Sequence, residues 1–358
     1  MRSLGPGATA IAALRSAVMA AAKAPFAPME ALLVEHLPGD PGWQFEPKWD
    51  GFRCIAARDG AEVALWSKSG KPLDRYFPEV AALFARLAPE RFVLDGELLI
   101  ETAGAMSFEA LQARLHPAAS RIAKLSAATP ALFMAFDCLA IGPELLASEP
   151  LIKRRAALER MLAKEVGGLL RLSPATTDRD EAAGWFDAGS TALDGVIGKR
   201  LADPYRPGER AMVKVKARRS ADCVVGGFRR KSGGTGVGSL LLGLYDDDGR
   251  LHHVGFTSSI TAKDRAGWSK ELDSLAGGSG FTGKAPGAPS RWATDRSAEW
   301  VAIKPEIVVE VLYDQVTGER FRHGTKLLRC RPDKRPKQCR MEQLSRPLSR
   351  AEVAKLLG

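Results

Sequence analysis

The sequence predicts an α+β fold in two domains: antiparallel sheets with helices, followed by a small β-barrel. Its 358 residues are enough for about two domains, and 45% hydrophobic residues can supply a core for each. Helical and strand-like patterns are mixed irregularly up to residue 217, which indicates sheets with helices beside them. From residue 222 onward, short strand-like segments recur at regular spacing, a pattern typical of a barrel.

The first domain follows an Ala-rich leader. Residues 1–26 contain no acidic residue, and we expect them to be poorly ordered or to form a solvent-facing helix. The segments 52–58 and 62–66 are predicted as strands joined by Asp59-Gly60, a strong hairpin signal. Further strands are expected at 92–100, 131–140, 194–199 and 212–216, and helices at 77–87, 105–115 and 151–166.

Some charged residues fall within these predicted elements. Asp95 and Asp137 interrupt apolar strands, where a carboxylate is costly unless it is paired, bound to metal or facing a cavity. The run Lys153-Arg154-Arg155 is most simply a solvated helix face.

The second domain is predicted to be an oligonucleotide-binding (OB) barrel. Its strands are expected at 222–228, 239–245, 252–256, 299–303 and 307–313, with a helix inserted at 261–275. Five strands with one helix fit this small barrel. We therefore place the first domain at 27–217, the barrel domain at 218–348 and a tail at 349–358.

The amino-acid composition indicates which kind of molecule the protein binds. The chain has 52 Lys plus Arg against 42 Asp plus Glu, a net charge of +10, and residues 326–340 contain seven basic residues and one acid. This excess favours a polyanion such as nucleic acid, although solubility alone could explain it. The five cysteines are scattered, which indicates reduced thiols in a cytosolic protein and neither disulfides nor a zinc site. No apolar run approaches the roughly 20 residues needed to span a bilayer.

The stretch Glu46-Pro-Lys48-Trp-Asp50-Gly51-Phe-Arg53 carries the most chemistry. A lysine amine is protonated at neutral pH, so a nucleophilic lysine needs burial or nearby positive charge. Bulky apolar residues surround Lys48 in the sequence, and Gly51 permits close approach of a ligand. The alternative is a surface lysine that enters a hairpin with Asp50-Gly51 as its turn.

This stretch resembles the Lys-x-Asp-Gly-x-Arg motif of the covalent nucleotidyltransferases, which include DNA ligases, RNA ligases and mRNA capping enzymes. In that superfamily the lysine attacks the α-phosphate of a nucleotide and carries the nucleotide as a phosphoramidate. The resemblance implies that Lys48 is the nucleophile, that Glu46 contacts the adenine and that Arg53 reaches the ribose. Lys68 lies where most ligases have an arginine, and lysine lacks the planar fork of that residue.

Further motifs follow in the order that the family has them. Asp95-Gly96-Glu97 resembles the motif whose glutamate accepts a hydrogen bond from the ribose, and Phe136 the aromatic that stacks on the base. Asp194-Gly195-Val-Ile-Gly-Lys199 resembles the motif Glu-Gly-x-x-x-Lys. Its acid is one methylene shorter here, and we expect Asp194, with Glu97, to contact a divalent metal.

The remaining motifs concern the phosphates. Lys214-x-Lys216 places two ammonium groups on one strand face, where they can flank the α-phosphate and disfavour protonation of Lys48. Arg210 is a further candidate nucleotide contact. Arg331-Pro-Asp333-Lys334 resembles the last motif of the family, which orients the leaving pyrophosphate.

We expect an ATP-dependent DNA ligase: a nucleotidyltransferase (adenylation) domain and a C-terminal OB-fold barrel, with ATP and Mg²⁺ or Mn²⁺ as cofactors. The resemblance covers about residues 27–344 and is closest to the compact bacterial ligases related to end joining. Its expected substrate is nicked duplex DNA, and its expected protein partners belong to end joining or base-excision repair. We expect a cytoplasmic, nucleoid-associated monomer that is not bound to a membrane.

Two other functions remain open from the sequence. An RNA ligase or capping enzyme would share the lysine motif, and tests with nicked RNA and GTP would reveal it. A non-catalytic OB-type nucleic-acid binder would form no labelled intermediate and would bind single strands tightly.

Overall fold

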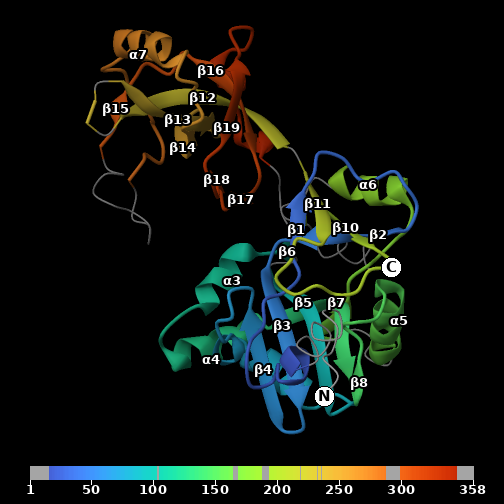
Figure 1. The fold of residues 1–358 in the computed structure, drawn as a ribbon. Helices are drawn as coiled ribbons and strands as arrows, with labels where there is room; N and C mark the ends of the chain where they lie inside the picture. The colour runs from blue at the N-terminus through green and yellow to red at the C-terminus, as the bar shows by residue number, and fades with distance from the viewer. Residues whose placement is uncertain are drawn as a thin grey trace. The chain divides into compact units, whose positions relative to one another are not determined.

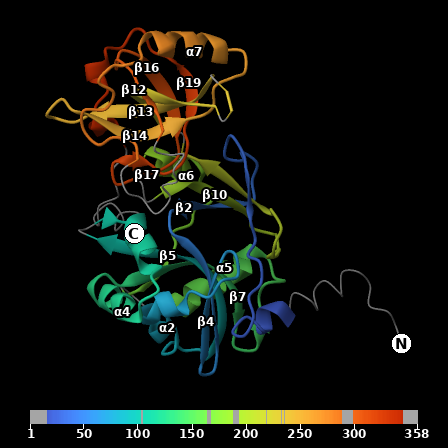
Figure 2. The ribbon, with the colours of Figure 1, turned by 90° about the vertical axis from the view of Figure 1, so that its left-hand side faces the viewer.

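The structure, a computed structural model, describes residues 16–102, 105–163, 168–187, 193–217, 219–231, 233–234, 236–287 and 299–344. Figures 1 and 2 show its ribbon in two views. The chain divides into two compact units, Met1–Ala217 with Pro347–Gly358, and Arg218–Arg346. Strands and helices are mixed in the first unit and strands dominate the second, which confirms the predicted α+β class.

A seven-stranded sheet forms the larger part of the first unit. Its path is β4 (Glu62–Ser67), β3 (Phe52–Asp59), β5 (Arg91–Thr102), β7 (Ala131–Ile141) and β8 (Glu144–Leu145), with β6 (Ala105–Met106) beside β5 and β9 (Leu170–Leu172) beside β7. All pairs are antiparallel except β7 with β9. The central strand β7 is buried on both faces, which explains its nearly continuous apolar sequence.

Helices cover one face of this sheet. They are α2 (Pro78–Phe84), α3 (Phe108–Arg114) and α5 (Leu151–Leu162), with α4 (Ala119–Ala128) beside α2 and α3 and the short η1 (Asp74–Tyr76) before α2. Phe84 of α2 and Leu158 of α5 enter the same apolar core as Phe133 of β7. The helices and the large sheet share one apolar core. The opposite face of the sheet packs against the leader and against residues of the second sheet.

A four-stranded sheet completes the first unit. Its order is β1 (Ala31–Leu33), β11 (Met212–Lys216), β10 (Leu193–Arg200) and β2 (Trp43–Trp49). Helix α6 (Arg179–Asp187) contacts β10 and β2 (Figure 1). The sequence did not predict β2, because Pro47 lies within it. A proline is tolerated there because β2 is an edge strand, the last in the order of this sheet.

Several predicted elements are confirmed, and two predictions are wrong in detail. The strands β3, β4, β5, β7, β10 and β11 lie where they were expected. The helix expected from residue 105 begins only at Phe108, because Ala105 and Met106 pair with β5. Helix α4 was not predicted. Arg154 does not lie on a solvated face: its side chain is 1% exposed and pairs with Asp137.

The leader also differs from its prediction in the part that is described. Val18 and Ala21 are fully buried against the large sheet. The indole N–H of Trp66 donates to the carbonyl of Ala21 at 2.7 Å. The described part of the leader is therefore attached to the domain through Val18 and Ala21, although other residues of it remain exposed. Residues 1–15, the end of the helix expected up to 166, and the tail at 349–358 lie outside the described residues.

The second unit is the predicted barrel. Its path is β14 (Leu251–Thr257), β13 (Val237–Tyr245), β12 (Arg219–Arg230), β16 (Val308–Tyr313) and β19 (Lys326–Cys330). Thr325, just before β19, donates its N–H to the Phe256 carbonyl at 2.9 Å. Because this contact and the bridge between Thr257 and Thr325 join the first strand to the last, the sheet closes on itself.

One strand of the barrel was assigned wrongly. The strand expected at 299–303 is only β15 (Val301–Ala302), which lies beside β12 outside the main path. The fifth place belongs to β19, whose sequence Lys-Leu-Leu-Arg-Cys is mostly exposed and lacks the apolar alternation that would have predicted a strand. The other elements are α7 (Arg265–Ser274), β17 (Val316–Thr317), β18 (Arg320–Phe321), η2 (Pro336–Gln338) and η3 (Met341–Gln343). Within the described ranges, no helix is long and apolar enough to cross a membrane.

Candidate active site

The first unit contains a cavity of about 1150 Å³, lined by residues of both sheets. The predicted site residues Glu46, Lys48, Arg53, Lys68, Glu97, Phe136 and Lys214 all line it. These residues are spread over nearly 170 positions of the chain and come from several strands and one loop. The fold therefore brings most of the predicted nucleotide contacts into one place.

Alternation along β2 points Lys48 towards this cavity. Phe45 and Trp49 enter the apolar core beside α6, whereas Glu46 and Lys48 belong to the other face of the strand. The Lys48 amine lies 2.6 Å from Oδ2 of Asp194, and its side chain is 25% exposed. The apolar surroundings expected for this amine are thus wrong in part, since it forms an ion pair with a carboxylate.

A bulge in β10 aims Asp194 at the lysine. The register shifts between the pairs Leu193 with Trp49 and Gly195 with Lys48, which leaves Asp194 as the extra residue. Gly195 has φ +143°, and a Cβ there would lie 2.0 Å from the carbonyl oxygen of Val215. Only glycine suits this position, and the carboxylate of Asp194 thereby also comes within 3.6 Å of the Lys216 amine.

Arg53 is fixed by a buried carboxylate. Its Nε and Nη2 each donate to Asp95 at 2.6 Å, and Asp95 is completely buried. The Tyr205 hydroxyl donates to the same carboxylate at 2.6 Å and accepts the backbone N–H of Met29 at 2.9 Å. Burial alone would lower the pKa of Arg53, but the Asp95 charge outweighs it and raises that pKa. Asp95 is thus paired, as its buried position requires, and the guanidinium is permanently charged.

Phe136 lies among cations in the cavity. The guanidinium carbon of Arg53 and the amine of Lys199 are each 4.7 Å from the centroid of its ring. Lys199 also lies 2.7 Å from Oε2 of Glu46, while Gln44 donates to Oε1 at 2.7 Å. Both oxygens of Glu46 are therefore engaged, and its carboxylate is held at a fixed place beside the ring.

Glu97 has the most perturbed carboxyl in the cavity. Burial raises its pKa to about 8, although the charges of Arg53 and Lys48 oppose this shift. At neutral pH the group therefore mostly carries a proton. Lys214 shows the corresponding effect for an amine: burial, followed by the charges of Lys48, Lys216 and Lys68, lowers its pKa. So many amines around one cavity favour a phosphate-bearing ligand.

The acidic residues fit a metal that is shared with a nucleotide. In the described part of the chain, no group of three or more His, Cys, Asp or Glu is arranged to hold a metal ion by itself. Asp194, and Glu97 once a bound metal displaces its proton, offer carboxylate oxygens, the ligands that Mg²⁺ and Mn²⁺ prefer. Since Mg²⁺ is commonly held by one or two carboxylates together with substrate phosphates, these two residues suffice for that arrangement.

Not every predicted residue lies at the cavity. Among the described residues that line it, Asp194, Arg210 and Lys216 are absent. Arg210 is exposed, whereas Asp194 pairs with Lys48, which lines the cavity, and with Lys216. Lys68 does line it and lies 3.2 Å from the Glu30 carboxylate.

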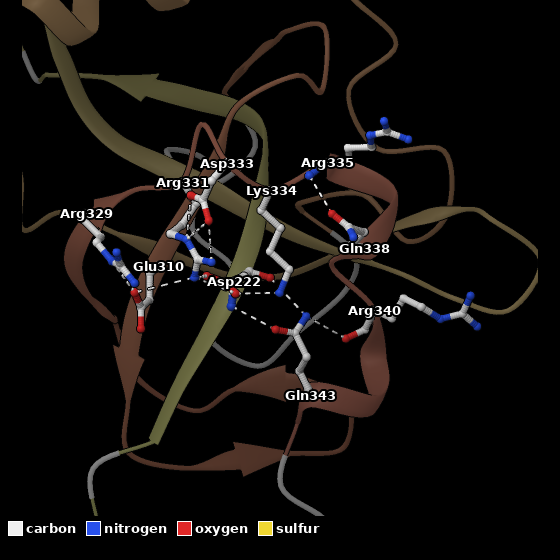
Figure 3. A network of polar contacts seen from close by, with 10 residues as sticks. All are labelled: Asp222, Glu310, Arg329, Arg331, Asp333, Lys334, Arg335, Gln338, Arg340 and Gln343. Atoms are coloured by element: carbon white, nitrogen blue, oxygen red, sulfur yellow. Dashed lines mark hydrogen bonds and ion pairs between the residues drawn. The ribbon is translucent and has the colours of Figure 1, made fainter.

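Arg331, Asp333 and Lys334 belong to the second unit, where they form a polar network (Figure 3). Nη2 of Arg331 lies 2.9 Å from Oδ2 of Asp333. The hydrogen bonds from Arg331 hold the pKa of Asp333 down at about 2.

Two contributors were missed from the sequence. Lys199 ends the motif that begins at Asp194, so its place in the motif could have identified it as a cavity residue. Tyr205 had no such signal, because a lone tyrosine in a loop indicates nothing until the fold brings it to Asp95.

The sequence matches two known families. Residues 24–216 match the family described as ATP dependent DNA ligase domain, and residues 233–334 match the ATP dependent DNA ligase C terminal region. The chain is 45% identical to DNA ligase C2 of Mycolicibacterium smegmatis, over 90% of this chain and 95% of that protein. It is 42% identical to DNA ligase C of Mycobacterium tuberculosis, over 91% and 95%. A solved structure, mycobacterial DNA ligase D complexed with ATP and MES, has a TM-score of 0.48 at 29% identity, over 88% of this chain and 97% of that one.

Proposed function

Because this chain belongs to the ATP-dependent DNA ligase family, we infer that it joins DNA strands through a nucleotide carried on Lys48. The observation that carries this inference is the single cavity in which Lys48 lies with Glu97, Phe136 and Lys214. A surface lysine in a hairpin would not have this setting. In fact Asp50 and Gly51 join two different sheets, because β2 pairs with β10 while β3 pairs with β4 and β5.

We propose that the cavity binds ATP with its base against Phe136. An aromatic ring supplies a flat apolar surface, and the neighbouring carboxylate of Glu46 can accept a hydrogen bond from the amino group of adenine. We assign Arg53 and Glu97 to the ribose and the amines of Lys214 and Lys68 to the phosphates, because all four residues line the same cavity. Arg53 needs no reorganisation for this role, since Asp95 already holds two of its nitrogens.

In the first step the Lys48 nitrogen forms a bond to the α-phosphorus, and the bond from that phosphorus to pyrophosphate breaks. The amine must first leave its ion pair with Asp194 and lose its proton, which the charges of Lys214 and Lys216 favour. A bound Mg²⁺ or Mn²⁺, held by Asp194 and Glu97, would neutralise phosphate charge. Arg331, Asp333 and Lys334 orient the departing pyrophosphate.

Two later steps complete the reaction. The AMP moves from Lys48 to a 5′-phosphate at a nick, and the adjacent 3′-hydroxyl then displaces AMP and closes the backbone. We assign the nucleotidyltransferase domain to residues 27–217 and the OB domain to 218–348, in keeping with the division into compact units after Ala217. We further propose that the protein is a monomer that acts in DNA repair, in end joining or base-excision repair, at the nucleoid.

The test is covalent labelling with ATP that carries a label on its α-phosphate. Wild-type protein incubated with metal is expected to retain the label after denaturation. Wild-type protein incubated with a chelator is expected to remain unlabelled. Lys48→Ala should retain only background label. Lys153→Ala is the matched control, because that lysine is 65% exposed, lies in the same unit and is expected to leave labelling unchanged.

The proposal fails if Lys48→Ala is labelled as strongly as the wild type. Parallel assays with GTP, and with nicked RNA in place of nicked DNA, distinguish a DNA ligase from a capping enzyme and an RNA ligase.

A further inference from the structure

One carboxylate joins the two cations of the Arg331–Lys334 segment. Oδ1 of Asp222 lies 2.9 Å from Nη1 of Arg331, and Oδ2 lies 2.6 Å from the amine of Lys334 (Figure 3). Asp222 is on β12, whereas the two cations follow β19, on the far side of β16 in the sheet order. The contact therefore links the segment to a strand more than 100 residues earlier in the chain.

Asp222 is itself held in place. Its backbone N–H donates to Oε1 of Gln343 at 3.1 Å, and its carbonyl accepts a hydrogen bond from Nε2 of the same side chain at 3.2 Å. Its backbone is also in the ladder with β16, opposite Glu310. The side chain is only 12% exposed, so the carboxylate is a fixed point and not a mobile surface group.

The two cations remain partly accessible. The Arg331 side chain is 19% exposed and that of Lys334 is 23% exposed. A guanidinium and an ammonium on one short turn repel each other, and a lysine gains rotamer freedom by turning into solvent. A carboxylate between them opposes both effects. It also leaves the lysine amine, which has three donor hydrogens, able to bind a further anion.

We propose that Asp222 is a positioning residue for the first chemical step, because it holds Arg331 and Lys334 together as a preformed site for the leaving pyrophosphate. This proposal depends on the role assigned above to Arg331 and Lys334. Asp222 does not contact the substrate; it acts through the two cations. Nothing in the sequence pointed to it, since it lies outside every motif.

The chemistry makes this role specific to one step. Pyrophosphate leaves only when the Lys48 nitrogen bonds to the α-phosphorus of ATP. In the last step the 3′-hydroxyl oxygen bonds to the 5′-phosphorus and AMP leaves with the electron pair, so no pyrophosphate is involved. A loss of Asp222 should therefore slow the first step and spare the last.

The experiment compares these two steps in Asp222→Asn, which removes the charge and keeps the shape. The first rate is single-turnover labelling of Lys48 by ATP, and the second is sealing of a nick whose 5′-phosphate already carries AMP. We expect the first rate to fall at least about tenfold, equivalent to about 1.4 kcal/mol. The second rate should stay within about twofold of wild type, and Asp222→Glu should recover part of the first.

The control is Asp246→Asn in the same unit. That carboxylate is also ion-paired, with Arg250, but lies outside the network of Figure 3, so both rates should be unchanged. If Asp222→Asn lowers both rates equally together with the melting temperature, its role is structural only and the proposal is overturned. Unchanged labelling by Asp222→Asn also overturns it.

The underlying role of Arg331 and Lys334 is tested separately. Labelling that survives in the double variant Arg331→Ala/Lys334→Ala contradicts the function assigned to them. A loss of labelling in that double variant but not in Asp222→Asn contradicts only the role of Asp222.

Discussion

At the scale of single residues, charge near the cavity is controlled by burial and by paired partners. Asp95 is completely buried, but hydrogen bonds from Arg53 and Tyr205 compensate for the loss of hydration of its carboxylate. Glu97 has less compensation, and burial raises its pKa to about 8. A fully paired carboxyl, that of Asp95, thus lies buried behind Arg53, while Glu97, which retains its proton at neutral pH, lines the cavity.

The raised pKa of Glu97 has a consequence for stability. Between its ordinary pKa of 4.5 and the folded value of about 8, the unfolded chain has lost this proton while the folded chain keeps it. Folding stability contributed by this group therefore falls as the pH rises through that window. Glu97→Gln removes the titration, so we expect its melting temperature to exceed that of wild type more at pH 9 than at pH 5.

Thermal unfolding of both proteins without nucleotide, from pH 5 to pH 9, measures this difference. Glu101→Gln is the matched control, since Glu101 is on the same strand and is not among the residues that line the cavity. A difference between Glu97→Gln and wild type that does not change with pH would contradict the raised pKa.

The residues around the cavity could be predicted from the sequence where they belong to a motif, and not where the fold alone brings them together. Seven predicted residues lie around one cavity, because they occupy fixed places in a known motif series. Tyr205 and Asp222 belong to no motif, and their partners are far away in the sequence. Their contacts depend on tertiary structure, which a local pattern does not encode.

At the scale of secondary structure, buried strands were the easiest elements to predict. β7 has an almost unbroken apolar sequence and lies where it was expected. β2 and β19 were missed for different reasons: a proline interrupts β2, and β19 is mostly exposed and has no alternation of apolar and polar residues. In both cases pairing with a neighbouring strand, and not the intrinsic strand propensity of the residues, determines the extended conformation.

Helix α5 shows how a charged helix residue can be structural. Arg154 binds both oxygens of Asp137, at 2.7 and 3.0 Å, and each side chain is 1% exposed. Removal of one partner would leave a buried charge without compensation. We expect Arg154→Met to lower the free energy of unfolding by about 3–5 kcal/mol.

Chemical denaturation measures that loss, and the double variant Arg154→Met/Asp137→Asn supplies the comparison. It should be clearly more stable than Arg154→Met alone, because no unpaired charge remains. Lys153→Met is the control for the helix, since its side chain is exposed and the expected change is within about 0.5 kcal/mol. A single variant as stable as wild type would contradict the importance of the pair.

At the scale of the whole molecule, the net charge of +10 is the property most relevant to DNA. Contacts between basic side chains and phosphates release counterions, so binding weakens as salt is added. We expect affinity for a nicked duplex to fall at least about tenfold between 50 and 200 mM salt.

Fluorescence anisotropy with a labelled nicked duplex measures this dependence, with chelator present to prevent sealing. An intact duplex of the same sequence is the control for phosphate contacts that do not depend on the nick. An affinity for the nicked duplex that stays constant between 50 and 200 mM salt would contradict binding that is mainly electrostatic.

The position of Lys48 within strand β2, paired with Gly195 of β10, limits where the reaction can happen. A lysine on a flexible loop could move together with its backbone, but the backbone of Lys48 is held by the hydrogen bonds between β2 and β10. In the mechanism that we propose, AMP attached to Lys48 can move only as far as the lysine side chain bends. Each DNA end must then be brought to Lys48, and a further ATP can react only after the AMP has been transferred.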